Sequence, residues 1–256
     1  MQIYVCVKHV PDSAANIHIL DRDRIDENVA FLLNPYDEHA VAEAAALKKA
    51  FDGSEIIAVT LGKKDAEKTL RSAMAMGADR GILVETRESC DSMVTARALA
   101  AAIQKDGRAD MILTGKESID AEGMQTLFRI GALMDLPVLT NAVNLEMGEG
   151  TARVVCELSG GMTRTFDTPL PCVIGAGRGL NTPAYPTFPD VVKARKKPVD
   201  VIALEDLGID TPPGSARITG LEPLVRERTP EAITGTPAEQ AARIIDILKN
   251  EAKVVS

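Results

Sequence analysis

MILTGKESIDAEGMQTLFR, residues 111–129, is the stretch that decides the predicted fold. Its first three residues form an apolar run of the kind found in strands covered on both faces, and Thr114 and Gly115 end that run. The polar loop from Lys116 to Gly123 then leads into a helical pattern of apolar residues that begins at Met124. A strand, a loop and a helix in this order are typical of the edge where an α/β sheet binds a nucleotide.

The loop itself has two interpretations. Free backbone N–H groups at the start of the following helix, with the positive end of the helix dipole, would suit a phosphate. Alternatively, the loop is an ordinary strand-to-helix connection in which Asp120 caps the helix. The stretch alone does not decide between them, so the decision rests on the remainder of the chain.

Composition places the chain among globular proteins with a large core. It has 256 residues, of which 45% are hydrophobic and 26% are charged, enough for one large α/β domain with or without an extended tail. Aromatic residues make up 3% and tryptophan is absent, so we expect an aliphatic, alanine-rich core. The formal net charge of −8 argues against a broad nucleic-acid surface, because such a surface needs a positive field.

The cysteines and one basic run are the remaining compositional features that bear on function. The four cysteines are Cys6, Cys90, Cys156 and Cys172; they have no CxxC spacing and three lie in apolar strand-like runs, so we expect reduced core residues and no metal site. The basic run Lys193–Lys197 is either a solvated loop or a docking surface.

The longest apolar runs are far shorter than a membrane span. The N-terminus, MQIYVCVKHV, enters a strand pattern directly, with no signal or transit peptide. We therefore expect a protein of the bacterial cytoplasm.

Strands and helices alternate over the first half of the chain. A strong helix start stands at Asn34, as N-cap, with Pro35 in the first helical position. Further helices are predicted at 65–76 and 91–104, and strands at 2–7, 55–61, 80–85 and 110–114. Because βαβ crossovers are right-handed and produce parallel sheets, the class is α/β with a parallel, Rossmann-like nucleotide-binding sheet.

In the second half of the chain, strands no longer alternate with helices. Strand candidates at 138–145, 153–158, 163–167 and 172–174 have no helix between them and predict an antiparallel extension of the sheet. The proline-rich segment that follows is expected to run over the surface or over another subunit. A capping box at Thr236 and Glu239 starts a last helix over 238–252, which packs on its own domain or on a partner. We predict a nucleotide-binding domain at 1–208, with a docking loop at 180–197, and a linker and helical arm at 209–256.

Motifs of bond-breaking chemistry are missing from the sequence. There is no Gly-x-Ser-x-Gly elbow, no P-loop, and no HExxH or paired CxxC pattern. The glycine-rich run Gly175–Gly179 resembles a dinucleotide fingerprint, but Leu180-Asn-Thr-Pro183 follows it instead of a helix, which favours a flexible turn. The sequence predicts a protein that binds a nucleotide and a partner, with no catalytic residue of its own.

The ordered set of motifs resembles the beta (small) subunit of electron transfer flavoproteins over most of the chain. The resemblance is carried by Val5–Lys8, Pro11-Asp12, Asn34–Glu38, Ala40-Val41, Leu70-Arg71, Ala75–Arg80, Gly115-Lys116, Ile119-Asp120, Gln125-Thr126, Glu157, Gly160-Gly161, Leu180-Asn181, Pro183, Tyr185, Pro189 and Lys193-Ala194. It implies a nucleotide-binding fold similar to that of the adenine nucleotide alpha hydrolases. It implies a heterodimer with a larger alpha subunit that holds most of the redox FAD. The dimer would accept electrons from acyl-CoA dehydrogenase-type enzymes and pass them to a quinone oxidoreductase, while the beta subunit buries a structural AMP.

The resemblance also assigns residues. The cofactor-binding set that it implies is Cys6, Asn34, Pro35, Tyr36, Asp37, Leu61, Ser118, Ile119, Asp120, Ala121, Glu122, Gly123, Met124, Gln125, Thr126 and Arg129. Tyr36 in that set matches an aromatic position near the flavin ring. The partner-binding set is Glu157, Leu180, Tyr185, Phe188, Pro189, Lys193 and Lys196. Here Glu157 would pair with the alpha subunit, and Phe188 would be the apolar anchor of the loop that docks on dehydrogenases.

Departures from the family pattern leave alternatives open. Leu127-Phe128-Arg129 stands where the family often has a small residue, so we expect an altered phosphate cradle in which Arg129 itself meets the phosphate. A flavin-bifurcating branch binds a second FAD in place of AMP and tends to carry Asp-Gly-Asp-Thr; this chain has Asp120-Ala-Glu-Gly123, which favours AMP. From other classes, the alternatives are a stand-alone adenine-nucleotide-binding stress-type protein and a nucleotide-dependent enzyme.

Overall fold

The computed structural model of the chain describes residues 1–209, 216, 218–224 and 230–255. The chain divides into two compact units, Met1–Gly220 and Leu221–Ser256, and each is described by itself. The predicted boundary between 208 and 209 stays a prediction.

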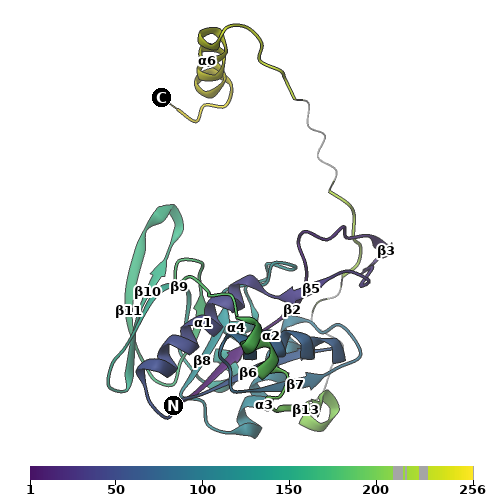
Figure 1. The fold of residues 1–256 in the computed structure, drawn as a ribbon, viewed down its shortest axis with the longest axis vertical. Coiled ribbons are helices and arrows are strands. Elements are labelled where there is room, and N and C mark those ends of the chain that lie inside the picture. The colour runs from purple at the N-terminus through teal and green to yellow at the C-terminus, as the bar shows by residue number, and fades with distance from the viewer. Residues whose placement is uncertain (210–215, 217, 225–229, 256) are drawn as a thin grey trace. The chain divides into compact units, whose positions relative to one another are not determined.

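A nine-stranded sheet forms the frame of the first unit (Figure 1). Its order is β11-β10-β9-β12-β8-β1-β6-β7-β13. The strands are β1 (Gln2–Cys6), β6 (Glu55–Gly62), β7 (Arg80–Glu85), β8 (Met111–Gly115), β9 (Val138–Met147), β10 (Thr151–Glu157), β11 (Thr163–Pro169), β12 (Val173–Ala176) and β13 (Val199–Ala203). Pairings from β9 through β12, β8, β1, β6 and β7 to β13 are all parallel, which confirms the predicted α/β class.

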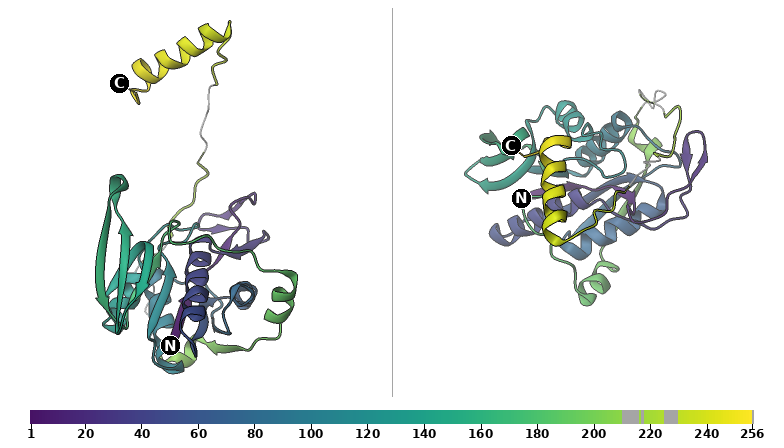
Figure 2. Two further views of the ribbon diagram at one scale, coloured as in Figure 1. Left: turned by 60° about the vertical axis from the view of Figure 1, so that its left-hand side comes forward. Right: turned by 90° about the horizontal axis from the view of Figure 1, so that it is seen from above.

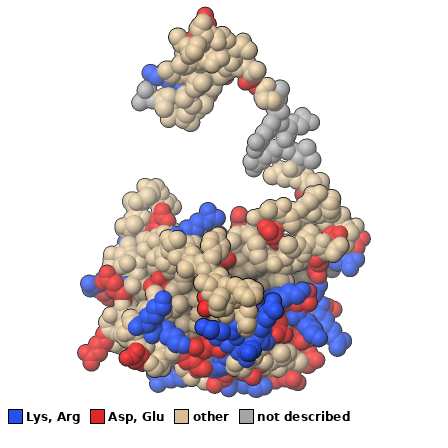
Figure 3. Space-filling view, in the orientation of Figure 1, with Lys and Arg blue, Asp and Glu red and all other residues tan. Residues whose placement is uncertain are grey.

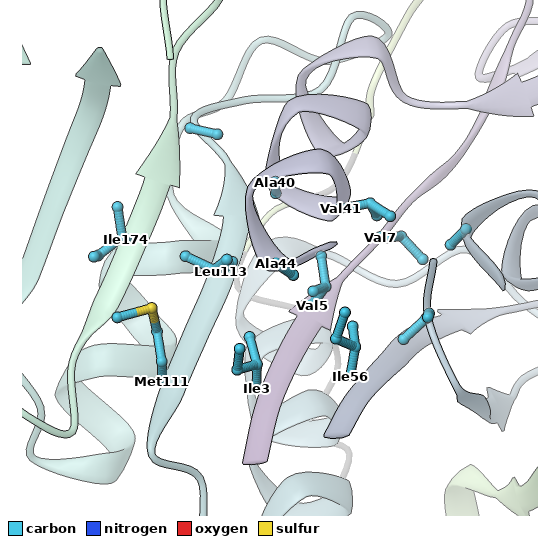
Figure 4. Close-up of a cluster of buried hydrophobic side chains, with 14 of the residues drawn as sticks. Ile3, Val5, Val7, Ala40, Val41, Ala44, Ile56, Met111, Leu113 and Ile174 are labelled. Atoms are coloured by element: carbon cyan, nitrogen blue, oxygen red, sulfur yellow. The ribbon is translucent and has the colours of Figure 1, made fainter. Parts of the chain in front are cut away.

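Helices cover both faces of this sheet because the strand residues alternate between two cores. Ile3 and Val5 of β1 face α1 (Pro35–Ala50) and α2 (Glu67–Met76), as the labelled side chains in Figure 4 show for α1. Tyr4 and Cys6 face α3 (Ser92–Asp106) and α4 (Thr126–Met134). Alanines such as Ala40 and Ala44 bring α1 close to the strands, as their number in the sequence predicted.

The antiparallel extension is confirmed for three strands and wrong for the fourth. β10 pairs antiparallel with β9 and with β11, and Figure 2 shows this ribbon standing at one side of the sheet. β12 instead lies between β8 and β9 and runs parallel to both. A four-residue apolar strand carries no signal of its direction, so its proximity in sequence to β11 was misleading.

Shorter elements complete the first unit. Two small antiparallel sheets pair β2 (His9–Pro11) with β5 (Phe31–Leu33) and β3 (Ile19–Asp21) with β4 (Arg24–Ile25). The proline-rich segment runs from β12 to a short helix, α5 (Phe188–Ala194), which packs on α2. 3₁₀ turns lie at η1 (Lys64–Ala66), η2 (Ser159–Gly161) and η3 (Leu204–Leu207).

The second unit contains one described helix, α6 (Pro237–Asp246), which continues into the π-helical turn η4 (Ile247–Glu251). The predicted capping box is present, since the Thr236 side chain accepts the Glu239 N–H and the Glu239 side chain accepts the Thr236 N–H. The apolar residues Ile244 and Ile245 are exposed. Among the helices of the described residues, none is both long and apolar enough to cross a membrane.

Candidate functional site

The candidate site lies where the parallel strands β1, β6, β8 and β12 end. Carboxyl ends of parallel strands meet at one edge, and ligands of such sheets bind there. The first turn of α1 and the loop between β8 and α4 occupy the same edge, so residues 6–8, 34–37 and 115–126 converge on it.

Asp37 ties three elements of this edge together. Its Oδ2 atom accepts the backbone N–H of Lys8 at 2.7 Å, and its Oδ1 atom accepts that of Gly115 at 2.9 Å. The side chain is buried, and burial raises its pKa to about 7, while the two backbone N–H groups and the Lys8 charge act in the opposite direction. Asp37 therefore fixes α1 against the ends of β1 and β8.

Asn34 holds the loop after β8. It stands at the predicted N-cap position of α1, but its side chain makes no capping bond. Instead, Nδ2 donates to the carbonyl of Glu117 at 2.9 Å and Oδ1 accepts the N–H of Ile119 at 3.2 Å. Because the Asn34 side chain is buried, these bonds place the loop firmly over the start of α1.

Lys8 holds the same loop from the other side. Its Nζ atom donates to Ser118 Oγ at 3.1 Å and lies 2.7 Å from both carboxylate oxygens of Asp120. Asp120 is therefore not the helix cap of the ordinary-connection interpretation. That interpretation is wrong about the cap, because α4 begins only at Thr126 and its N-cap position is Gln125.

The end of the loop turns sharply into α4. Glu122 and Met124 both have a φ of 48°, in the left-handed region that non-glycine residues rarely adopt. Gln125 Oε1 then accepts Ser92 Oγ at 3.1 Å and Arg129 Nη2 at 2.6 Å, joining the loop to the start of α3. Arg129 Nη1 is buried and has no hydrogen-bond partner among the described residues.

These features fit a nucleotide phosphate. The first N–H groups of a helix have no intrahelical partner, and Gln125 makes no side-chain capping bond to those of α4. The unsatisfied Nη1 of Arg129 lies one turn further along the same helix. An anion at this point would satisfy both the guanidinium and the helix N–H groups.

The remaining residues of the predicted cofactor set stand at strand ends, in the first turn of α1 and in the loop before α4. Cys6 is the last residue of β1 and is buried, and burial raises the pKa of its thiol to about 12. Leu61 lies near the end of β6 and packs on the core under α3 and α4, which contains Tyr4 and Cys6. The residues from Ala121 to Gln125 are exposed, with the side chain of Met124 38% accessible.

The proline-rich segment is anchored at its first end on α1. Leu180 packs against the core under α1 and α2, which contains Ile3 and Val5, and the Asn181 side chain reaches α1. Asn181 Nδ2 donates to the His39 carbonyl at 3.0 Å and to Glu43 Oε2 at 2.8 Å. Burial raises the pKa of Glu43, and the bond from Asn181 opposes that shift.

The second end of the proline-rich segment is anchored on α2, because a cation from each side donates to carbonyls at the end of the other helix. Arg71 of α2 donates from Nη1 to the carbonyls of Ala194 and Lys197, at 3.0 and 2.5 Å. Lys197 Nζ in turn donates to the carbonyls of Met74 and Ala78, at 2.9 and 2.6 Å. Cations at helix C-termini are favourable, so Lys197 fixes α5 to α2 and is not part of a free basic surface.

Between these anchors the segment presents apolar side chains to solvent. Tyr185 is 95% exposed and Phe188 80% exposed. Pro189 and Lys193 on α5, and Lys196 just after it, are also exposed. Figure 3 shows Lys and Arg side chains gathered over the region of α2 and α5. These five predicted partner residues are therefore exposed, whereas the sixth of this segment, Leu180, is partly buried against the core under α1.

Glu157 lies apart from that surface, at the end of β10 in the antiparallel ribbon. Its side chain is exposed and its carbonyl accepts Asn141 Nδ2 at 2.9 Å. The neighbouring Leu158 and Met162 are exposed at the turn between β10 and β11. The two predicted partner contacts thus belong to different faces of the unit.

The structure adds Lys8, Ser92 and Gly115 to the candidate site. Gly115 is the last residue of β8 and Lys8 follows two residues after the end of β1, positions that sequence reasoning could have used. A methyl group on Gly115 would lie 2.4 Å from Asp37 Oδ1 and 2.6 Å from Tyr36 Cβ, so this close approach requires glycine. Ser92 has no comparable signal, because α3 is distant from the loop in sequence.

Comparisons with known proteins find relatives over the whole length of the chain. The model of the electron transfer flavoprotein domain matches residues 24–207. The chain is 33% identical to electron transfer flavoprotein subunit beta of Bacillus subtilis (strain 168), covering 100% of both chains. It is 35% identical to the mitochondrial subunit beta of Arabidopsis thaliana, again over 100% of both, and 34% identical to subunit beta of Homo sapiens, over 99% of both.

Proposed function

This chain belongs to the electron transfer flavoprotein family as a beta subunit, and from that premise we propose that it binds AMP at the carboxyl edge of its sheet. It pairs with a larger alpha subunit that holds most of the FAD, the group that supplies the electron chemistry when bound. The dimer accepts electrons from acyl-CoA dehydrogenase-type flavoenzymes and passes them to a quinone oxidoreductase. The chain is a carrier subunit of the bacterial cytoplasm, without bond-breaking catalysis.

The observation that carries the nucleotide proposal is the unsatisfied guanidinium beside an uncapped helix start. Among the residues that the structure describes, the buried Nη1 atom of Arg129 has no hydrogen-bond partner, and α4 begins three residues earlier. A phosphate accepts hydrogen bonds from both, which is the arrangement that anions adopt at helix N-termini.

The loop from Ser118 to Thr126 forms the rest of the proposed site. Asn34 and Lys8 hold it at Glu117, Ile119 and Asp120 by the bonds described above. A loop fixed before the ligand arrives loses less conformational entropy on binding. The proposal therefore gives Asn34 and Lys8 the role of positioning the loop.

The docking proposal rests on the segment fixed at both ends. Asn181 holds one end to α1 and Lys197 the other to α2, while Phe188 stands 80% exposed between them. An exposed aromatic side chain on a fixed support is suited to enter an apolar pocket of a partner. Lys193 and Lys196 beside it would speed the encounter with an acidic surface. On the other face, Glu157 is proposed to contact the alpha subunit.

A variant of Asn34 tests the nucleotide proposal. We expect the purified protein to release AMP on heating, and Asn34→Ala to retain several-fold less, because two loop groups lose their buried partner. Asn144→Ala is the matched control, since it removes one exposed bond to Glu146. Release of FAD instead of AMP would support the second-FAD alternative. No bound nucleotide in either protein would contradict the proposal.

A further inference from the structure

Tyr36 has two cations over its aromatic ring. Lys116 Nζ lies 5.2 Å from the ring centroid, and the guanidinium carbon of Arg178 also lies 5.2 Å from it. Lys116 follows β8 and Arg178 follows β12, so both cations stand at the carboxyl edge of the sheet. Arg178 belongs to the glycine-rich run, which the proposed function does not otherwise use.

Glycines hold this arrangement together. Gly115 permits β8 to end directly against Tyr36, because a methyl group on Gly115 would lie only 2.6 Å from the Cβ atom of Tyr36. Gly177 donates its N–H to the Ala142 carbonyl at 2.9 Å, and a methyl group there would lie 2.7 Å from Asn141 Oδ1. The Leu180 N–H then donates to the Gly177 carbonyl at 3.2 Å and closes a turn that carries Arg178. The position of Arg178 is thus set by the backbone.

Only one of these two cations has a carboxylate partner among the described residues. Lys116 Nζ lies 3.3 Å from Glu117 Oε1, which offsets one charge. No carboxylate of the described residues lies within ion-pair distance of Arg178, whose side chain is in an exposed turn. Two cations held over one ring repel each other, so an anion beside Tyr36 would be attracted to both.

The residues around Arg178 indicate which partner would bring an anion to Tyr36. The turn that carries Arg178 packs on Asn141, and Asn141 in turn donates to the carbonyl of Glu157. Glu157 is the residue proposed to contact the alpha subunit, so the cations lie toward the side on which that subunit would bring its cofactor. A flavin cofactor carries negative charge on its phosphates and takes up more on its ring when reduced.

We propose that Lys116 and Arg178, held over Tyr36, form a cation site for the negative charge of the flavin cofactor. This inference rests on the proposed function, because it requires a flavin bound at the subunit interface. The site adds a charge contribution from this chain to a cofactor held mainly by the partner. Preorganised cations are most effective where negative charge develops, because they need no rearrangement when it appears.

Arg178→Met tests the site in the purified heterodimer. If the cations face the ring, we expect about tenfold less preference for the reduced flavin, which lowers the midpoint potential by about 30 mV for a two-electron couple. If they face the phosphates, we expect about tenfold weaker binding of both redox states and no change in potential. Both results support the cation site and identify the part of the cofactor that it meets.

Matched variants make the result specific. Lys116→Met is expected to act in the same direction as Arg178→Met, and Arg178→Lys to restore most of the parent behaviour. Arg164→Met is the control, because it removes the same contact, 5.2 Å from the ring of Phe166, in the antiparallel ribbon. Parent values of potential and affinity in both Met variants would overturn the inference. A parent heterodimer without flavin would instead overturn the proposed function.

Discussion

The Oδ1 atom of Asp37 accepts the backbone N–H of Gly115 at 2.9 Å, across 78 positions of the sequence. This bond joins the first turn of α1 to the end of β8 at the edge where the nucleotide is proposed to bind. The second carboxylate oxygen of Asp37 accepts the Lys8 N–H after β1. A single buried side chain therefore sets the spacing between the elements of the candidate site.

Gly115→Ala is expected to destabilise the protein by about 1–3 kcal/mol, because a methyl group would overlap Asp37 Oδ1 and Tyr36 Cβ. Denaturant unfolding measures the change in the free energy of unfolding, and nucleotide content should fall with it. Gly220→Ala is the control, since its methyl group would meet only Arg22 Nε, at 4.0 Å. Equal stability of the two variants would show that the close approach at Gly115 is unimportant.

The buried carboxyl of Asp37 should make stability depend on pH. Its pKa is raised from 3.8 to about 7 in the folded state, so between these values the folded protein holds an extra proton. The stability from Asp37 is complete below pH 3.8 and is lost as the pH rises through 7, with a slope of up to about 1.4 kcal/mol per pH unit.

The neutral variant Asp37→Asn isolates this effect. Its lost hydrogen bond costs the same at every pH, so the stability of the parent relative to the variant should fall from pH 5 to pH 8. Replacement of the exposed Asp52 by Asn should leave the slope of the parent unchanged. Parallel stability curves for the parent and Asp37→Asn would contradict the raised pKa.

Adjacent lysines of the basic run should behave differently. Lys197→Met should lower the free energy of unfolding by about 1.5–3 kcal/mol, because Lys197 donates to the carbonyls of Met74 and Ala78. Lys196→Met should leave stability unchanged and slow association with the dehydrogenase at low salt, since Lys196 is exposed. Stopped-flow association and thermal unfolding separate the two effects. The reverse pattern would show that the anchoring role is assigned to the wrong residue.

Phe188→Ala is expected to weaken docking on the dehydrogenase by about 2 kcal/mol or more, because buried aromatic anchors carry much of the energy of an interface. The flavin content should stay at the parent value, as Phe188 is 80% exposed in this chain. Leu20→Ala removes another exposed apolar side chain, far away in sequence, and should change neither property. Unchanged kinetics of electron uptake in Phe188→Ala would reject its role as the anchor.

The sequence predicted most elements because their signals are local. Gly77 ends α2 with a φ of 140°, Asp91 caps α3 through the N–H groups of Met93 and Val94, and Thr236 and Glu239 form their capping box. Each depends on residues within one turn of the helix, so the pattern is visible without the fold.

Long-range relationships were not visible in this way. Asn34 is of a residue type favoured at N-cap positions, yet its side chain forms hydrogen bonds with Glu117 and Ile119, which lie 83 and 85 positions away in the sequence. Lys197 looks like surface charge but caps α2, and β12 inserts into the middle of the sheet. In each case the local pattern fits several partners, and tertiary packing selects among them.

The same limit applies to the candidate site. The converging segments were predicted from strand ends and from the family resemblance. The contacts of Lys8 with Asp120 and of Arg178 with Tyr36 required the fold, because each joins segments more than 100 residues apart.

The most direct test of the whole account is the composition of the chain co-expressed with an electron transfer flavoprotein alpha subunit. Native mass spectrometry and the visible absorption spectrum would be recorded on the purified product, and the nucleotides released by heat would be identified. We expect a yellow one-to-one heterodimer that holds one FAD and one AMP. A colourless homodimer of this chain that binds ATP and does not associate with the alpha subunit would contradict it.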